Sequence, residues 1–252
     1  MRIFTDLAAW QQARLTLATT STLGFVPTMG NLHQGHSSLF AQSLQDNHLT
    51  AVSIFVNPLQ FNDPSDYQHY PRTLADDLAL LEKQHVDYVL VPKASELYPE
   101  HLHYQLAEHK LSLDMEGMYR PQHFEGVLTV VMKLLHLVKP NHVYFGEKDY
   151  QQCMLIQHML EAFFMDIDMT ICPTVREACG LPFSSRNRRL SAPQRHLAAQ
   201  FAQIFQQSLP IDAIKHQLED LNIKIDYLVD KASRRFVAVW IDEVRLIDNR
   251  LL

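Results

Sequence analysis

The chain has 252 residues, of which 47% are hydrophobic and 20% charged, and this mixture excludes disorder for most of its length. No apolar run approaches the roughly 18 to 20 residues that cross a bilayer, and residues 1–10 lack the pattern of a secretion signal. A net charge of -6 argues against a general nucleic-acid-binding protein, and three cysteines without a Cys-x-x-Cys pair argue against a zinc ribbon. We therefore expect a cytoplasmic protein that binds neither nucleic acid nor a membrane.

The first 172 residues alternate between the sequence periods of strands and helices. Strands are expected at residues 22–27, 49–56, 87–91, 142–145 and 167–172. Helices are expected from residue 35, at 73–84, at 125–138 and at 150–164. Repeated β-α-β units with apolar strands predict an α/β fold with a doubly wound parallel sheet, in which ligands bind at the carboxyl ends of the strands.

The pattern changes after Arg176. A polar loop leads to expected helices at 193–207 and 211–221, and then to short strands at 223–228, 236–240 and 244–247. These elements predict a small α+β domain. We place the first domain at residues 1–176 and the second at 177–252.

The four residues His33-Gln34-Gly35-His36 stand between the first expected strand and the first expected helix. A helix N-terminus presents unpaired N–H groups and a positive dipole, and two imidazoles can add donors for phosphate oxygens. A chance His-x-Gly-His has a probability of about 2% at this composition. The turn therefore predicts a nucleotide site.

Two other segments could also hold phosphates. Residues 146–149 (GEKD) occupy the same strand-to-helix position, where Lys148 offers a point charge and Asp149 can cap the helix, although a plain charged turn has the same pattern. Residues 183–187 (FSSRN) offer two hydroxyls and a guanidinium, but such a segment is also an ordinary turn and N-cap. Gln60 and Gln152 carry uncharged amides that both donate and accept hydrogen bonds, which suits the binding of a hydroxy acid. By themselves they could also be ordinary surface residues.

Six segments in this order resemble one family, although no single one would decide the matter. They are PTMGNLHQGH (27–36), VSIFVNPLQF (52–61), YPRT (70–73), RPQHFEGV-TVV-KL (120–134), FGEKDYQQ (145–152) and SSRN (184–187). Together they resemble the pantoate-β-alanine ligases over about residues 20–195, with weaker echoes at 225–228 (IDYL) and 245–249 (RLIDN).

The resemblance implies a Rossmann-like domain of the nucleotidyltransferase type, followed by a small C-terminal lid domain, in a homodimer. It also implies an enzyme that adenylates pantoate with Mg-ATP and then transfers the pantoyl group to β-alanine. The products would be pantothenate, AMP and pyrophosphate. ATP is then a substrate and Mg²⁺ the implied metal.

The resemblance also assigns site residues. Those implied for ATP are Met29, Gly30, Asn31, Leu32, His33, Gln34, Gly35, His36, Gly146, Glu147, Lys148, Asp149, the Val175 backbone, Phe183, Ser184, Ser185 and Arg186. Among these, the implied catalytic residues are His33, His36, Lys148 and Arg186. Gln60 and Gln152 are implied to hold pantoate, with Asn57 and Arg120 around them. Asp76 and Asp77 are implied neighbours of magnesium.

The chain departs from the family pattern at four positions. Cys179 replaces an acidic residue, Pro182-Phe183 replaces Ala-Met, and Gln122 replaces a glycine. The helical part of the second domain is also expected to be a few tens of residues short. Two other functions remain open: another nucleotidyltransferase with a His-x-Gly-His turn, and a nucleotide-binding regulator that has lost turnover.

Overall fold

The structure of the chain, a computed structural model, describes residues 1–18, 20–99 and 103–252. These residues form two compact units. The first unit holds residues 1–32, 36–146 and 151–172. The second unit holds residues 173–252 together with two short pieces from earlier in the chain, 33–35 and 147–150.

A six-stranded parallel sheet forms the centre of the first unit and confirms the predicted doubly wound fold. Its strands are β1 (Arg2–Phe4), β2 (Leu23–Thr28), β3 (Leu49–Ile54), β4 (Tyr88–Leu90), β5 (His142–Gly146) and β6 (Asp168–Cys172). They lie in the order β1-β4-β3-β2-β5-β6. The order therefore reverses at β2, which has β3 on one side and β5 on the other. The carboxyl ends of β2 and β5 at this switch point are where a doubly wound sheet binds its ligand.

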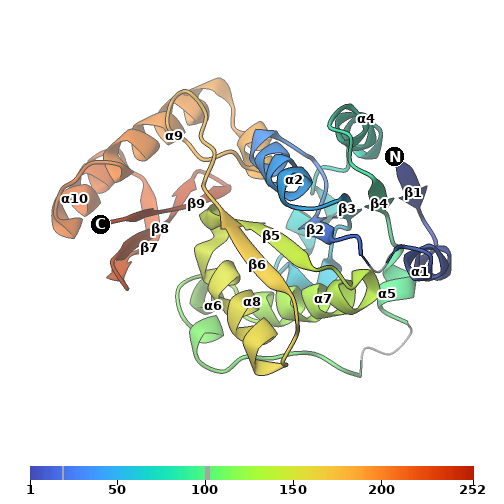
Figure 1. Cartoon of the computed structure of the whole chain (residues 1–252). Helices are drawn as coiled ribbons and strands as arrows, with labels where there is room; N and C mark the ends of the chain where they lie inside the picture. Colours follow the sequence, from blue (N-terminus) through green and yellow to red (C-terminus); the bar gives the residue numbers. More distant parts are fainter. Residues whose placement is uncertain (19, 100–102) are drawn as a thin grey trace. The chain divides into compact units, whose positions relative to one another are not determined.

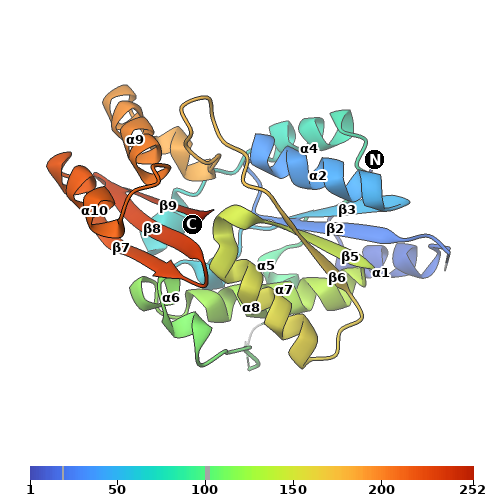
Figure 2. The ribbon, with the colours of Figure 1, turned by 60° about the vertical axis from the view of Figure 1, so that its left-hand side comes forward.

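Helices cover both faces of this sheet. They are α1 (Leu7–Leu15), α2 (Gln34–Asp46), α3 (Pro64–Gln68), α4 (Leu74–Lys83), α5 (Ala94–Leu97), α6 (Glu116–Tyr119), α7 (His123–Val138) and α8 (Tyr150–Ala162). Figure 2 shows α2 and α4 on one face, with α1, α7 and α8 on the other. Three 3₁₀ turns accompany them: η1 (Pro58–Gln60), η2 (Leu111–Leu113) and η3 (Glu147–Asp149).

Alternate residues of the central strands face opposite layers. Phe25 of β2 packs in a core cluster that includes Leu128 of α7 and Ile156 of α8. Its neighbour Val26 packs in a second cluster with Phe40 of α2. Burial on both faces explains why the strands appear in the sequence as continuous apolar runs rather than as alternating ones.

The second unit has its own sheet and core. After the turn η4 (Ser185–Arg189), helices α9 (Ala192–Phe205) and α10 (Ile211–Asp220) precede strands β7 (Lys224–Lys231), β8 (Arg234–Ile241) and β9 (Val244–Leu251). The strands form an antiparallel sheet in chain order, seen beside the two helices in Figure 1. Phe201 of α9 and Leu218 of α10 share a core with Val237 and Val239 of β8.

Strands β8 and β9 extend beyond the predicted ranges because the residues added to them are largely polar and nevertheless mostly buried. Strand β8 begins at Arg234 and β9 runs to Leu251, so both include residues outside the apolar pattern. Arg234, Asp248 and Asn249 are all buried there. None of the helices in the described ranges is long and apolar enough to cross a membrane.

Candidate active site

The turn after β2 carries the predicted nucleotide residues Met29 to Leu32 in an unusual backbone conformation. Gly30 has φ +77° and Asn31 has φ +50°, both in the left-handed region. The carboxylate of Asp77, on the first turn of α4, accepts hydrogen bonds from the backbone N–H groups of Asn31 (2.9 Å) and Leu32 (2.8 Å). The Thr73 hydroxyl donates to the same carboxylate at 3.2 Å. Asp77 is only 3% exposed and thus fixes the shape of this turn.

His33 belongs to the second unit, where its ring stacks on Phe183 with the ring centroids 6.0 Å apart. A Cβ on Gly35 would lie 3.0 Å from Cε1 of His33, so a side chain at position 35 would crowd the imidazole. Burial, followed by the positive charges of Lys148 and Arg188, lowers the pKa of His33 to about 4. His33 is therefore neutral at pH 7 and can serve as a hydrogen-bonding group rather than as a cation. His36 lies in the first turn of α2, in the first unit.

Lys148 and Asp149 lie in η3, the turn that joins β5 to α8. The side chain of Lys148 is largely buried, and its Nζ lies 3.6 Å from Oδ1 of Asp149. The charge of Lys148 adds to the effect of burial in lowering the pKa of His33. Two residues that come from distant predicted motifs, His33 and Lys148, thus share one electropositive region of the second unit.

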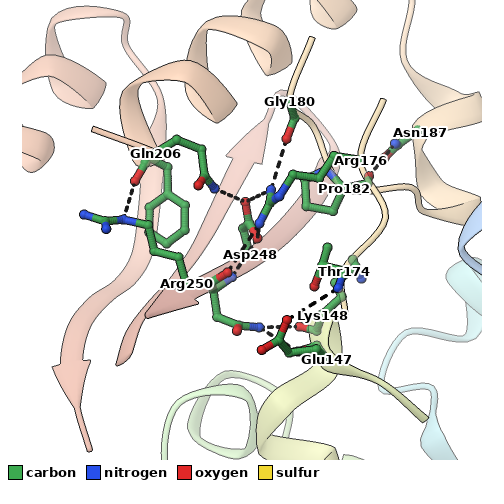
Figure 3. A network of polar contacts seen from close by, with 12 residues as sticks. Glu147, Lys148, Thr174, Arg176, Gly180, Pro182, Asn187, Gln206, Asp248 and Arg250 are labelled. Carbon is green, nitrogen blue, oxygen red and sulfur yellow. Dashed lines mark hydrogen bonds and ion pairs between the residues drawn. The ribbon is translucent and has the colours of Figure 1, made fainter. Parts of the chain in front are cut away.

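The segment with the two serines closes a compact loop in the same unit. The N–H of Phe183 donates to the carbonyl of Val175 at 3.1 Å, and the Ser184 side chain caps η4 by accepting from the N–H of Arg186 at 3.3 Å. Asn187 donates to Glu177 (2.7 Å) and to the Pro182 carbonyl (2.9 Å), the latter seen in Figure 3. The predicted ATP residues of this loop are therefore held by backbone and side-chain bonds within it.

The family departures have structural roles in the same loop and before α7. Cys179 packs against the core of the second unit, Pro182 pairs with Arg176 in an isolated β-bridge, and Phe183 stacks on His33. Gln122 has φ +65°, in the left-handed region where a glycine has no steric cost. The glycine that the family pattern has at this position is explained by that conformation.

Gln60, a predicted pantoate residue, is held in the first unit by Asn57. The Asn57 amide donates to Oε1 of Gln60 (3.0 Å) and to the carbonyl of Gly126 on α7 (3.0 Å). Its own oxygen accepts from the hydroxyl of Tyr98 at 2.8 Å. A Cβ on Gly126 would lie 2.4 Å from the carbonyl oxygen of Leu59, so only a glycine lets the 57–60 turn approach α7.

The backbone of Gln60 is held from the opposite side by Arg120 and His123. Nδ1 of His123 lies 2.8 Å from the Gln60 carbonyl, and a guanidinium nitrogen of Arg120 lies 3.1 Å from Nε2 of His123. Because arginine can only donate, Nε2 must accept, and Nδ1 then carries the proton given to Gln60. Arg120 also pairs with Glu116 at 3.4 Å. Arg120 itself donates to the Gln60 carbonyl at 3.3 Å, so Arg120 and Asn57 both contact Gln60. His123 is a member of this group that sequence reasoning missed.

Gln152 lies in the first turn of α8, next to the buried Gln151. The oxygen of Gln151 accepts from the N–H of Glu116 at 3.1 Å, and its amide donates to the carbonyls of Leu111 and Asp114. The α6 segment is therefore bonded both to the Arg120 and His123 group and to the start of α8. Gln60 is thus joined through this series of polar contacts to Gln151, the neighbour of Gln152 in the chain.

Comparisons with known proteins match the whole chain. A family model described as Pantoate-beta-alanine ligase matches residues 2–251. A relative named pantothenate synthetase from Legionella pneumophila (strain Corby) is 53% identical over 252 residues, which is 100% of both chains. Another of that name, from Coxiella burnetii (strain RSA 331 / Henzerling II), is 49% identical over 98% of this chain and 96% of its own.

Solved structures match equally well. A pantoate-beta-alanine ligase from Francisella tularensis, complexed with beta-gamma ATP and beta-alanine, has a TM-score of 0.96 at 39% identity and covers 100% of this chain and 97% of its own. A pantothenate synthetase from Thermus thermophilus has a TM-score of 0.91 at 36% identity, with 100% and 99% covered. The expectation of a shortened second domain is wrong relative to these proteins, because the match extends over essentially their full lengths.

Proposed function

The chain belongs to the pantoate-β-alanine ligase family, whose ATP-dependent reaction it carries out, and we propose that separate groups of its residues bind the nucleotide and the pantoate. The observation that supports this division most directly is the electropositive region around His33. There, burial of the imidazole, followed by the positive charges of Lys148 and Arg188, lowers its pKa to about 4. Positive charge that disfavours an imidazolium favours a bound anion. The phosphates of a nucleotide would therefore neutralise the charges around His33.

In this proposal the nucleotide is bound by the turns that follow β2 and β5 and by the loop that contains the two serines. Met29 to His36 line the nucleotide, Gly146 to Asp149 and Val175 contact it, and Phe183 to Arg186 bind its phosphates. Lys148 and Arg186 supply charge, while His33 supplies a neutral N–H. His36 stands at the N-terminus of the 13-residue helix α2, where the helix dipole also favours an anion.

Pantoate is held by Gln60 and Gln152, with Asn57 and Arg120 fixing Gln60. Neutral amides can bind the hydroxyl groups of pantoate without pairing with its carboxylate, which remains available to react. An oxygen of that carboxylate attacks the α-phosphorus of ATP, and the bond from phosphorus to the pyrophosphate oxygen breaks. The β-alanine amine then attacks the acyl carbon, loses a proton and releases AMP. Positioning and charge stabilisation supply the rate, so no protein nucleophile is required.

Magnesium enters this proposal as part of the Mg-ATP substrate. Within residues 1–18, 20–99 and 103–252, no group of three or more His, Cys, Asp or Glu side chains could hold a metal ion. The Asp77 carboxylate, an expected magnesium neighbour, is engaged by the backbone of Asn31 and Leu32. Mg²⁺ commonly takes most of its ligands from phosphates and water, and a built protein site is not needed for it. We therefore assign Asp77 to the turn. Asp76 is exposed, and we propose it as the carboxylate of this pair that lies near the magnesium ion.

The experiment that tests this function supplies ATP, pantoate and β-alanine together and measures AMP and pantothenate. Equal amounts of both products, formed only when all three substrates are present, are expected. Pyrophosphate release with a phosphate ester or nicotinate nucleotide in place of pantoate would instead identify another nucleotidyltransferase. ATP binding without any product would identify a regulator. The homodimer that the resemblance implies and the cytoplasmic location expected from the sequence are part of the same proposal. Light scattering after size exclusion tests the homodimer.

A further inference from the structure

Two adjacent polar residues near the C-terminus, Asp248 and Asn249, lie in β9 within the RLIDN segment, and the proposed function gives them no role. They are 2% and 3% exposed, although a buried carboxylate and a buried carboxamide are costly unless hydrogen bonded. Both are fully engaged within the second unit. Their partners include the Lys148 turn and Arg176, which lies in the loop between Val175 and Phe183, and these are the segments that the proposed function assigns to ATP.

Asn249 holds the turn that carries Lys148. Its amide nitrogen donates to the backbone carbonyls of both Glu147 and Lys148, each at 2.9 Å. Two bonds from one amide to successive carbonyls fix the orientation of the peptide units from which the Lys148 side chain projects. The amide oxygen of Asn249 in turn accepts from the guanidinium of Arg234.

Arg234, on β8, fixes the rest of the same turn. Its guanidinium donates to the carboxylate of Glu147 at 2.7 Å and lies over the ring of Tyr150, with Cζ 4.1 Å from the ring centroid. Arg234 therefore contacts the turn on both sides of Lys148, at Glu147 and at Tyr150. Asn249 binds the backbone between these two residues. The N–H of Thr174 adds a longer bond, 3.4 Å, to the Glu147 carboxylate, as Figure 3 shows.

Asp248 holds the other phosphate segment through Arg176. The guanidinium of Arg176 forms a two-pronged ion pair with the Asp248 carboxylate, at 2.7 and 2.9 Å, and also donates to the carbonyl of Gly180 at 3.0 Å. Arg176 pairs with Pro182 as well. Burial raises the pKa of the Asp248 carboxyl, and the guanidinium of Arg176 acts against that rise. The loop from Val175 to Phe183 is thus anchored to β9 at its base.

We propose that Asp248 and Asn249 are positioning residues that hold the Lys148 turn and the Val175–Arg186 loop at a fixed separation suited to the ATP phosphates. The proposal rests on the proposed function of those two segments. Preorganised donors stabilise a transition state without rearranging during the reaction, and a displacement of about 1 Å can cost about 10²-fold in rate. Strand β9 supplies that preorganisation because its adjacent residues Asp248 and Asn249 each bind one of the two segments. The RLIDN segment thereby acquires a role in catalysis as well as in folding.

The test replaces Asn249 and follows ATP use separately from pantoate use. Asn249→Ala should lower kcat/KM for ATP by about 10- to 10²-fold, because Lys148 is no longer held, while KM for pantoate stays near the parent value. Asp226→Asn is the matched control. Asp226 is a buried carboxylate of the same sheet that accepts from Arg245 (2.7 Å) and Trp240 (2.9 Å), all on β7 to β9. This variant should lose stability and keep its ATP kinetics.

A double-mutant cycle with Lys148→Ala decides whether Asn249 acts through Lys148. If it does, Asn249→Ala has little further effect on kcat/KM in the Lys148→Ala protein. Equal fold-losses in both backgrounds, or Asn249→Ala kinetics like those of Asp226→Asn, would overturn the proposal. Lys148→Ala with full activity would instead overturn the role of Lys148 in the proposed function.

A second variant keeps the test decisive if Asn249→Ala does not fold. Asn249→Asp retains an oxygen for Arg234. It turns a second oxygen toward the carbonyls of Glu147 and Lys148 and adds a negative charge, so the two donated bonds are replaced by repulsion. It should lose ATP kcat/KM at least as strongly as the alanine variant. Parent-like ATP kinetics in a folded Asn249→Asp protein would contradict the proposal in the same way.

Discussion

The turn after β2 depends on the Asp77 carboxylate, which the family resemblance also implies as a neighbour of magnesium, and Asp77→Asn separates the two roles. Asp77 accepts from two backbone N–H groups, at 2.8 and 2.9 Å, and is 3% exposed. An asparagine has one accepting oxygen, so the substitution leaves one buried N–H facing an NH₂ group. Hydrogen bonds to a charged partner contribute about 1.5 to 3 kcal/mol, and an unpaired buried donor adds to the loss, so we expect about 3 kcal/mol of destabilisation.

A change of that size should lower the melting temperature by about 6 to 12 °C for a chain of this length. The KM for ATP should rise because the turn no longer holds its shape, and the Mg²⁺ concentration for half-maximal rate should stay the same. Asp76→Asn is the control, since Asp76 is exposed and shares the first turn of α4. Both variants lose a carboxylate charge from the first turn of α4, worth about 0.3 to 1 kcal/mol through the helix dipole, so the difference between them reports the loss of charge and of one accepting oxygen from the buried turn.

The measurements are thermal melts of both variants and initial rates over a range of free Mg²⁺. A melting temperature for Asp77→Asn equal to that of Asp76→Asn, combined with a strongly raised Mg²⁺ requirement, would refute the positioning role. It would show that the carboxylate serves the metal.

Three other predictions follow from the site. Lys148→Ala should lower the rate of pantoate adenylation by about 10² to 10³-fold with an unchanged melting temperature, since one preorganised charge is lost from a turn whose backbone is held elsewhere. The pKa of about 4 at His33 lies below its ordinary value, so the unfolded chain binds a proton here at a higher pH than the folded chain does. As the pH drops from about 6.5 to about 4, the free energy of unfolding of the parent should therefore decrease relative to that of His33→Gln. Urea melts of both proteins at several pH values measure this difference. Gly126→Ala would place a Cβ 2.7 Å from the Gln60 nitrogen and should raise KM for pantoate and lower stability. In Gly146→Ala the new Cβ meets no heavy atom of the described residues within 4 Å, and that protein should melt like the parent.

The sheet could be predicted from the sequence because its strands are buried on both faces. The continuous apolar runs at 49–56 and 142–145 match β3 and β5. Strand β1 gave no such signal, since it has three residues and only Phe4 among them is buried. The ends of β8 and β9 were missed because Arg234 and Asn249 are held by polar bonds, which hydrophobic periodicity does not detect.

The site could be predicted as a set of motifs and not as a set of contacts. The His33 turn and the Lys148 turn were singled out as separate phosphate segments, yet only the fold shows that burial, with the charge of Lys148 added to it, lowers the pKa of His33. The same holds for Asp77 and Asn31, which are far apart in the chain and joined by one hydrogen bond. His123 had a signal in the RPQHF stretch, but its bond to the Gln60 carbonyl depends on α7 lying against η1.

The central claim, that pantoate is activated in a separate step before β-alanine reacts, is tested most directly by isotope exchange. The purified protein is incubated with ATP, Mg²⁺, pantoate and labelled pyrophosphate, without β-alanine, and the label in ATP is counted. A bound adenylate that forms reversibly predicts label in ATP that depends on pantoate and is lost in Lys148→Ala. Exchange that appears only when β-alanine is added would contradict a separate adenylation step.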